Sequence, residues 1–349
     1  METIWFCLVA VMIAMYVLLD GFDLGAGAIH FLVAKTREER RQVIATIGPV
    51  WDGNEVWLIA AGGVLYFAFP ALYASSFSGF YLPLMAVLWL LILRGIAIEF
   101  RNHVRSDVWV PLWDFVFFGA SLLLAVFYGA ALGNVVRGVP LDESGYFFEP
   151  LWTNFQLGEH TGILDWYTIL VGVLALLAVM MHGGLWVQLK TAGAVNERAA
   201  RVANRAWWGV LAITVLVTFI TFHVQPQVGE NFRTWPAGYV LPFLAVAGLA
   251  GVQFELRRKN ELHAFLASCL YVLGMLTSVV FGVYPMVLPA RDPIYSLTVH
   301  GAKAGAYGLK VGLVWWISGM ILATIYFVYV YRSFAGKVIP EQNRHETGH

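Results

Sequence analysis

Six polar residues stand among strongly apolar ones in the first hundred positions of this sequence. They are Asp20, Asp23, Asp52, Asn54, Glu55 and Arg94. The two aspartates lie in LDGFDLGAG, the next three residues in GPVWDGNEVW and the arginine in LILRGIAIEF. Burying ionisable side chains costs free energy, so their presence inside apolar segments is a functional hypothesis by default.

The chemistry that this set favours is proton transfer. Asp20 and Asp23 are three positions apart and therefore share one face of a helix. Buried carboxyl groups that lie close together hold protons more readily than isolated ones, as a group in a proton path must. A structural ion-pair cluster, in which Arg94 neutralises one acid, is the alternative. We expect Glu99 to reach the lipid headgroup region rather than to belong to this proton path.

The elements that position these residues are membrane helices. Of the 349 residues, 59% are hydrophobic and only 13% are charged, whereas a soluble domain carries about a quarter charged residues. Apolar runs of about 20 residues predict spanning helices. The predicted spans are 4–34, 48–73, 78–98, 111–136, 162–187, 205–223, 237–255, 263–285 and 305–331. An acidic residue, Glu2, precedes the first run where a signal peptide is basic, so we expect a retained helix. The fold class is an all-α integral membrane protein.

The distribution of Lys and Arg predicts the direction of insertion. The connections after spans one, three, five and seven, together with the tail, hold sixteen of these residues. The opposite side holds four, which are Arg137, Arg233, Arg291 and Lys303. By the positive-inside rule, the N-terminus is outside and the C-terminus is cytoplasmic. Spans one to three then bring their charged residues to the cytoplasmic half, and we expect Asp52 to face the first span. Nothing comparable is expected on the outer half.

Other kinds of site have little support. Cys7 and Cys269 form no metal or haem-attachment spacing and are expected to be small buried side chains rather than a disulfide. The net charge of zero and the lack of a long basic block exclude a nucleic-acid partner. Haem iron needs facing His or Met ligands. His182 is the best single candidate, but no second ligand matches its depth, so no metal, cofactor-binding or catalytic residue is assigned to this chain.

Several of these segments resemble one known family. LDGFDLGAG, GPVWDGNEVWLI, SGFYLPL and LRGIAIEFR, together with RGVP at 137–140 and SLTVHGAKAGAYGLK at 296–310, are similar to subunit II of cytochrome bd ubiquinol oxidase. The similarity covers nearly the whole chain, although the loops at 99–110 and 224–237 are compact for the family.

The resemblance implies a fold, a partner and a location in the bacterial cytoplasmic membrane. The fold is two four-helix bundles, 4–136 and 162–285, followed by a peripheral helix at 305–331 and a cytoplasmic tail at 332–349. The partner is subunit I, which holds two b-type haems and one d-type haem and oxidises quinol with oxygen. Some relatives also hold a structural quinone in subunit II, and some bind a small accessory subunit. The six polar residues named above become members of a cytoplasmic proton path.

Two other functions explain part of the pattern. An ion-coupled secondary transporter would also bury carboxylates, but transporters break helices in both halves of an internal repeat, and spans five to eight show no matching set. A purely structural scaffold leaves the carboxylates unexplained. The face at 21–27 is rich in glycine and requires a close helical neighbour. We therefore expect the contact with the partner subunit to include spans one and two.

Overall fold

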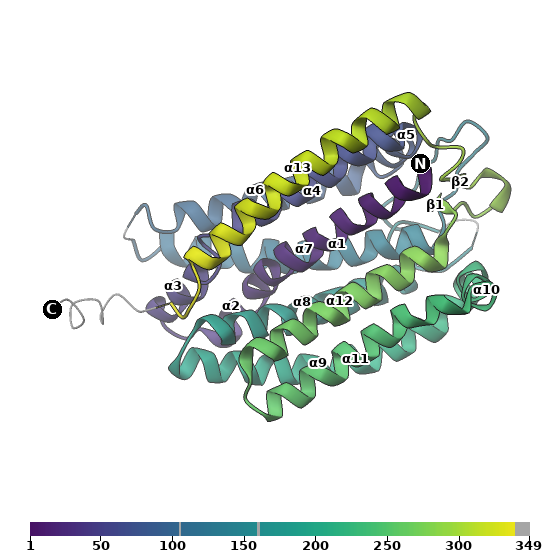
Figure 1. The fold of residues 1–349 in the computed structure, drawn as a ribbon. Helices are drawn as coiled ribbons and strands as arrows, with labels where there is room; N and C mark the ends of the chain where they lie inside the picture. The colour runs from purple at the N-terminus through teal and green to yellow at the C-terminus, as the bar shows by residue number, and fades with distance from the viewer. Residues whose placement is uncertain (105, 159–160, 339–349) are drawn as a thin grey trace.

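The structure, a computed structural model, describes residues 1–104, 106–158 and 161–338. From position 339 onward, the predicted tail lies outside the described residues. Figure 1 shows an elongated bundle whose long helices run between two ends. The N-terminus, β1 and β2 lie at one end, and α2 and α3 lie at the other. The helices in the first half of the chain are α1 (Glu2–Ala28), α2 (His30–Val33), α3 (Arg37–Ala45), α4 (Trp51–Ala68), α5 (Pro70–Gly79), α6 (Tyr81–Phe100) and α7 (Trp109–Arg137).

The second half of the chain is also helical, with one small hairpin. Its elements are α8 (Trp166–Lys190), α9 (Gly193–Val224), α10 (Pro226–Thr234), η1 (Pro236–Tyr239), α11 (Val240–Arg257), α12 (Glu261–Val283), β1 (Met286–Leu288), η2 (Pro293–Tyr295), β2 (Leu297–Thr298) and α13 (Ala306–Ser333). The two strands pair antiparallel. Eight described segments are long and apolar enough to cross a membrane: α1, α6, α7, α8, α9, η1 with α11, α12 and α13. The chain is therefore a multi-pass membrane protein.

The second predicted span is not one continuous helix. Residues 48–73 fold as the end of a turn, α4 and the start of α5, with a break at Phe69. Pro70 lacks the N–H that would continue α4, so the helix ends and a new one begins at the proline. Across the break, the backbone N–H of Ala304 donates to the carbonyl of Ala68 (2.9 Å). Such a break is tolerated at membrane depth only where the freed backbone groups find partners of this kind.

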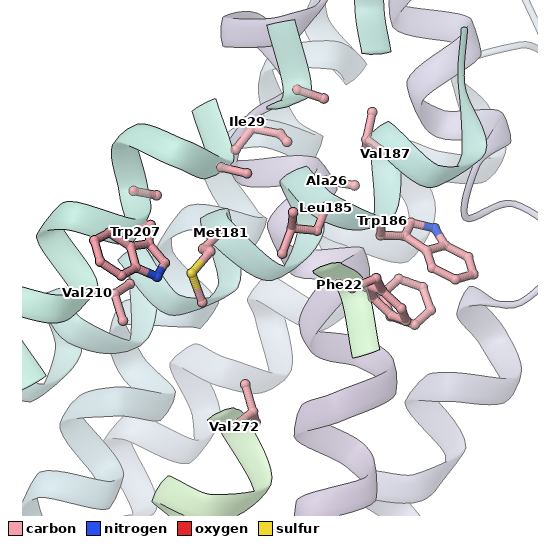
Figure 2. Packing of buried hydrophobic residues seen from close by; sticks show 14 of the residues in the cluster. Phe22, Ala26, Ile29, Met181, Leu185, Trp186, Val187, Trp207, Val210 and Val272 are labelled. Carbon is pink, nitrogen blue, oxygen red and sulfur yellow. The ribbon is translucent and has the colours of Figure 1, made fainter. Parts of the chain in front are cut away.

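Helix α1 is the central element of the bundle. It contacts α4 and α7 on one side and α8 and α12 on the other. Figure 2 shows Phe22, Ala26 and Ile29 of α1 in the buried apolar cluster that also contains Met181 and Leu185 of α8. Both cysteines are free, but Cys7 is exposed on α1 rather than buried as predicted.

The glycines at 21–27 of α1 find their close neighbours within this chain. A Cβ atom on Gly25 would lie 2.0 Å from the carbonyl oxygen of Val179 and 2.8 Å from the Cα of Gly183. A Cβ atom on Gly27 would lie 2.1 Å from Ser121 Oγ on α7. Gly25 and Gly27 point to opposite sides of α1, where α8 and α7 already pack, so these glycines give no reason to place a partner subunit there.

A short helix, α3, connects the first two long segments. Thr36 and Glu39 form a capping box at its start, which satisfies two of the free backbone N–H groups. Burial alone would raise the pKa of Glu39. Hydrogen bonds from the Lys35 and Thr36 backbone and from Arg198 of α9 outweigh burial and lower it.

The contact between α1 and α8 gives a direct test of packing. Gly25→Ala would force the two backbones apart, and overpacking of this kind costs about 1–3 kcal/mol or more. We expect a clearly lower thermal midpoint or loss of the folded protein. Gly21→Ala is the matched control one turn away, because its Cβ would meet nothing closer than 3.8 Å. Thermal unfolding of the purified protein in detergent measures both variants, and equal midpoints would contradict the packing argument.

Candidate functional site: buried charge clusters

A fully buried arginine joins three helices. Arg94 of α6 donates from Nη1 to Asp20 Oδ1 of α1 (2.6 Å) and from Nη2 to Glu55 Oε2 of α4 (3.0 Å). Arg94 and Asp20 are fully buried, whereas the Glu55 side chain is 21% exposed. The guanidinium therefore lies between a deep carboxylate and one near the protein surface. The sequence-based expectation that these three residues come together is confirmed.

Asp23 has a neutral partner instead of a charged one. Asn54 Nδ2 of α4 donates to Asp23 Oδ2 (2.8 Å), and Tyr331 of α13 donates to Asn54 Oδ1 (2.8 Å). The amide thus connects the aspartate to the last helix of the chain. Asn54 was predicted to belong to the cluster. Tyr331 was not, because no sequence pattern connects Asn54 to a tyrosine 277 positions away.

Asp52 does not face α1, so that expectation was wrong. Its side chain is exposed at the start of α4, whereas Asn54 is fully buried. Two positions on a helix differ by about 200° in direction, so Asp52 and Asn54 must point to opposite sides. Glu55, three positions after Asp52, lies between these directions. Glu99 is likewise exposed, at the end of α6.

Several buried polar atoms of this cluster lack a protein partner among the described residues. They are Asp20 Oδ2, Asp23 Oδ1 and Arg94 Nε. Buried polar groups in proteins are nearly always hydrogen-bonded, and internal water supplies the partner where protein does not. The cluster therefore combines carboxyl groups with positions suited to water, which is the arrangement that proton transfer needs.

A second charged cluster, which sequence analysis missed, lies toward the end of the bundle where α3 lies. Asp114 of α7 is fully buried and accepts from Arg101 Nε (2.5 Å) and Arg40 Nη1 (3.2 Å). It also contacts His30 Nε2 (3.1 Å). The signal was present, because Asp114 is an ionisable residue inside a predicted span and the rule applied to Asp20 selects it equally.

A third cluster contradicts the expectation that the other end has nothing comparable. Arg137, at the end of α7, donates to Asp165 and to Glu149 Oε1 (2.8 Å). Arg291 also pairs with Glu149. Asp165 caps α8 by accepting from the backbone of Tyr167 (2.7 Å). This cluster fixes the ends of α7 and α8 and the loop between them.

His182, the candidate haem ligand, does not fit the role of an axial ligand. His182 Nδ1 lies 2.7 Å from Ser268 Oγ, and its Nε2 lies 2.9 Å from the carbonyl oxygen of Leu18. Both ring nitrogens are therefore engaged, and the histidine connects α8 to α1 and α12. Within the described ranges, no group of three or more His, Cys, Asp or Glu residues is placed to hold a metal ion.

These features define a class: a helical multi-pass membrane protein whose buried charges are neutralised in clusters between helices. A family model described as cytochrome bd terminal oxidase subunit II matches residues 1–334. The chain therefore belongs to the cytochrome bd terminal oxidase subunit II family.

Individual relatives agree with this assignment. The chain is 32% identical to cytochrome bd ubiquinol oxidase subunit 2 of Bacillus subtilis, with 89% of each chain covered. It is 27% identical to cytochrome bd-I ubiquinol oxidase subunit 2 of Escherichia coli, covering 99% of this chain and 97% of the relative. A chain in the structure of bd oxidase from Geobacillus thermodenitrificans has a similar fold, with a TM-score of 0.75 at 16% identity over 95% of this chain and 98% of that one.

The Arg94 cluster predicts a double-mutant result. Arg94→Gln alone leaves Asp20 buried without its counter-charge, and breaking a buried pair in this way costs about 3–5 kcal/mol. We expect strongly reduced yield of folded protein. Adding Asp20→Asn removes the uncompensated charge and should recover much of that yield. Glu99→Gln, an exposed carboxyl on the same helix, should have little effect. Gel-filtration yield of the three variants and the wild type measures this, and a double variant no better than Arg94→Gln would contradict it.

Proposed function

We propose that this chain is the non-haem subunit of a quinol:oxygen oxidoreductase and supplies part of its cytoplasmic proton path. The family match along nearly the whole chain carries the first part of this proposal. The cluster of Asp20, Arg94 and Glu55 carries the second, because it runs from a fully buried carboxylate to a partly exposed one.

The proposed topology has nine crossings, with α4 and α5 together forming the second, an outside N-terminus and a cytoplasmic C-terminus. The proposal divides the helices into two groups, which also contact each other through α1 and α7 against α8. In residues 4–136, α1 contacts α4 and α7, and α6 contacts α7. In residues 162–285, α8 contacts α9 and α12, and α11 contacts α12. Helix α13 lies outside both groups, where Trp5 Nε1 donates to the carbonyl of Leu309 (3.1 Å). The bacterial cytoplasmic membrane is the proposed location.

The proposed partner is a haem-bearing subunit I with two b-type haems and one d-type haem, with quinol and oxygen as the substrates of the complex. The engaged nitrogens of His182 support placing the haems in the partner. An apolar cavity of about 390 Å³ between α8, α9 and α12, lined in part by Tyr167, Thr221 and Tyr271, is large enough for part of a structural quinone. A small accessory subunit belongs to the same proposal.

Asp52 has a different proposed role from the buried acids. Its exposed side chain lies on the same edge of α4 as Glu55, so it can pass protons out of this chain toward the partner subunit. The series of side chains Asp20, Arg94, Glu55 and Asp52 then leads from the buried carboxylate on α1 to the exposed carboxylate on α4. Asp23 and Asn54 complete the path beside Asp20. An ion-coupled transporter receives no support from the family match.

The oxidase assignment can be tested by reconstitution. The chain expressed with its proposed partner should yield a complex with haem absorption and quinol-dependent oxygen consumption. The chain expressed alone should be colourless, since both ring nitrogens of His182 are engaged in hydrogen bonds. Absorption spectra and an oxygen electrode measure both outcomes. A haem-replete chain without any partner, or a complex without oxidase activity, would contradict the assignment.

Asp52→Asn tests the proton path at its exposed end. The substitution keeps side-chain size but removes the exchangeable carboxyl proton. We expect an assembled, haem-replete complex whose turnover per haem falls by about an order of magnitude or more, as for loss of a general acid–base group. Glu38→Gln, an exposed carboxyl on α3, is the matched control and should retain turnover. Full turnover in Asp52→Asn would show that this aspartate takes no part in the path.

A further inference from the structure

The last turn of α13 makes one polar contact that reaches into the Arg94 cluster. Tyr331 Oη donates to Asn54 Oδ1 of α4 (2.8 Å), and Asn54 Nδ2 donates to Asp23 Oδ2 of α1 (2.8 Å). Asn54 and Asp23 are fully buried, and Tyr331 is half-buried. A phenol, an amide and a carboxyl group from three helices thus form one unbroken chain of hydrogen bonds.

The amide of Asn54 has one favourable orientation in this chain. Its Nδ2 also donates to the backbone carbonyl of Leu19 on α1 (3.3 Å). A backbone carbonyl can only accept, so the NH₂ group must face α1 and the amide oxygen must face α13. The opposite orientation would place the amide oxygen against the carbonyl oxygen of Leu19. Asn54 therefore acts toward Asp23 only as a donor, and its oxygen is left for Tyr331.

This donor gives the two oxygens of Asp23 different roles. Oδ2 accepts the N–H of Asn54, so a proton on Oδ2 would face another proton. Within the described ranges, Oδ1 is buried and has no hydrogen-bond partner. A proton on Asp23 is therefore carried by Oδ1. When that proton leaves, the O–H bond at Oδ1 breaks, and the hydrogen bond from Asn54 to Oδ2 stays and stabilises the carboxylate that remains.

The hydroxyl of Tyr331 strengthens the hydrogen bond that Asp23 receives. A donor on the amide oxygen withdraws electron density from the amide nitrogen, which makes its N–H a stronger donor. Hydrogen bonds in a chain polarise one another in this way, and the effect is largest where water is excluded. Tyr331 therefore acts on Asp23 through Asn54, although its hydroxyl bonds only to the amide.

The chain just after α13 holds Tyr331 in place. All of α13 is described, and Leu309, near its other end, is its one buried residue. Deep packing therefore does not fix the end that carries Tyr331. Residues 334–338 do so instead, because the backbone N–H of Val338 donates to the carbonyl of Lys190 at the end of α8 (2.8 Å). Lys337 Nζ also pairs with Glu261 Oε2 at the start of α12 (2.7 Å).

We propose that Tyr331 is a positioning residue of the proton path, which acts through Asn54 so that Asp23 carries its exchangeable proton at Oδ1. This inference rests on the proposed function, because it takes Asp23 as a member of that path. The alternative is that the hydroxyl only docks α13 against α4. Docking alone would stabilise the helix and leave the carboxyl group of Asp23 unchanged, so a signal from that carboxyl group distinguishes the two roles.

Two changes at position 331, made in the assembled complex with its partner subunit, test this role. Tyr331→Phe removes only the hydroxyl, and replacement of Tyr331 by a fluorinated tyrosine keeps the ring but makes the hydroxyl a stronger donor. Tyr329→Phe is the matched control, because Tyr329 lies on the same helix and is 71% exposed. The readouts are turnover per haem and the infrared carbonyl band of Asp23 in oxidised-minus-reduced spectra, assigned by its absence in Asp23→Asn.

We expect Tyr331→Phe to move the Asp23 band to higher frequency, because its carbonyl oxygen then receives a weaker hydrogen bond. Turnover should fall about two- to tenfold, the factor that corresponds to one hydrogen bond. The fluorinated tyrosine should move the band to lower frequency, and Tyr329→Phe should change neither quantity. An Asp23 band at its wild-type position in Tyr331→Phe would overturn the proposal, even if turnover falls. If Tyr331→Phe does not assemble, the fluorinated variant decides, and an unshifted band there overturns the proposal.

The same measurements separate this inference from the proposed function. If Asp23→Asn loses turnover while Tyr331→Phe leaves the Asp23 band unshifted, Asp23 stays in the path and only the role of Tyr331 fails. If Asp23→Asn keeps wild-type turnover, the proposed function fails at Asp23, and the role of Tyr331 in the path fails with it.

Discussion

The structure depends first on how one guanidinium is kept charged inside an apolar bundle. Arg94 is fully buried, and the desolvation of an arginine costs several kcal/mol unless charged partners with good geometry surround it. Asp20 and Glu55 supply that geometry from two other helices. The requirement fixes the relative heights of α1, α4 and α6, because a shift of one helical turn would separate the charges. A polar cluster thus sets the register, which apolar packing in a membrane specifies only weakly.

Small residues make this arrangement possible on the opposite side of α1. Gly25 brings α1 into backbone contact with Gly183 of α8, and the aromatic ring of Phe22 stacks on Trp186 at 4.1 Å between centroids. The glycine face and the acidic face are therefore two sides of one helix with different tasks. One side fixes the helix to the second half of the chain, and the other presents ionisable groups to α4, α6 and α7.

Much of the fold could be predicted from the sequence, because hydrocarbon thickness sets the length of apolar runs. The break at Phe69 was missed, although Pro70 was visible, because prolines also occur within membrane helices and only a tertiary partner such as Ala304 decides the outcome. The composition of the Arg94 cluster was predictable from charge alone. The direction of Asp52 was not, since α4 is apolar on every side beyond its first turn and gives no periodicity that fixes its phase. The third cluster was missed because Glu149 lies in a loop, and the pairing of loops with helix ends follows no local rule.

Asp52 differs from the buried acids in its surroundings. Asp20 and Asp114 have their charge balanced within this chain, by Arg94 and by Arg101 with Arg40. Asp52, by contrast, is exposed at the start of α4, and the exposed apolar residues Val56 and Ile59 follow it on the same face of the helix. A carboxylate in such surroundings is costly against lipid, because hydrocarbon offers it no hydrogen bond. A partner surface with donors or water opposite Asp52 removes that cost. Under the proposed function, the same contact extends the series of ionisable groups beyond this chain at Asp52.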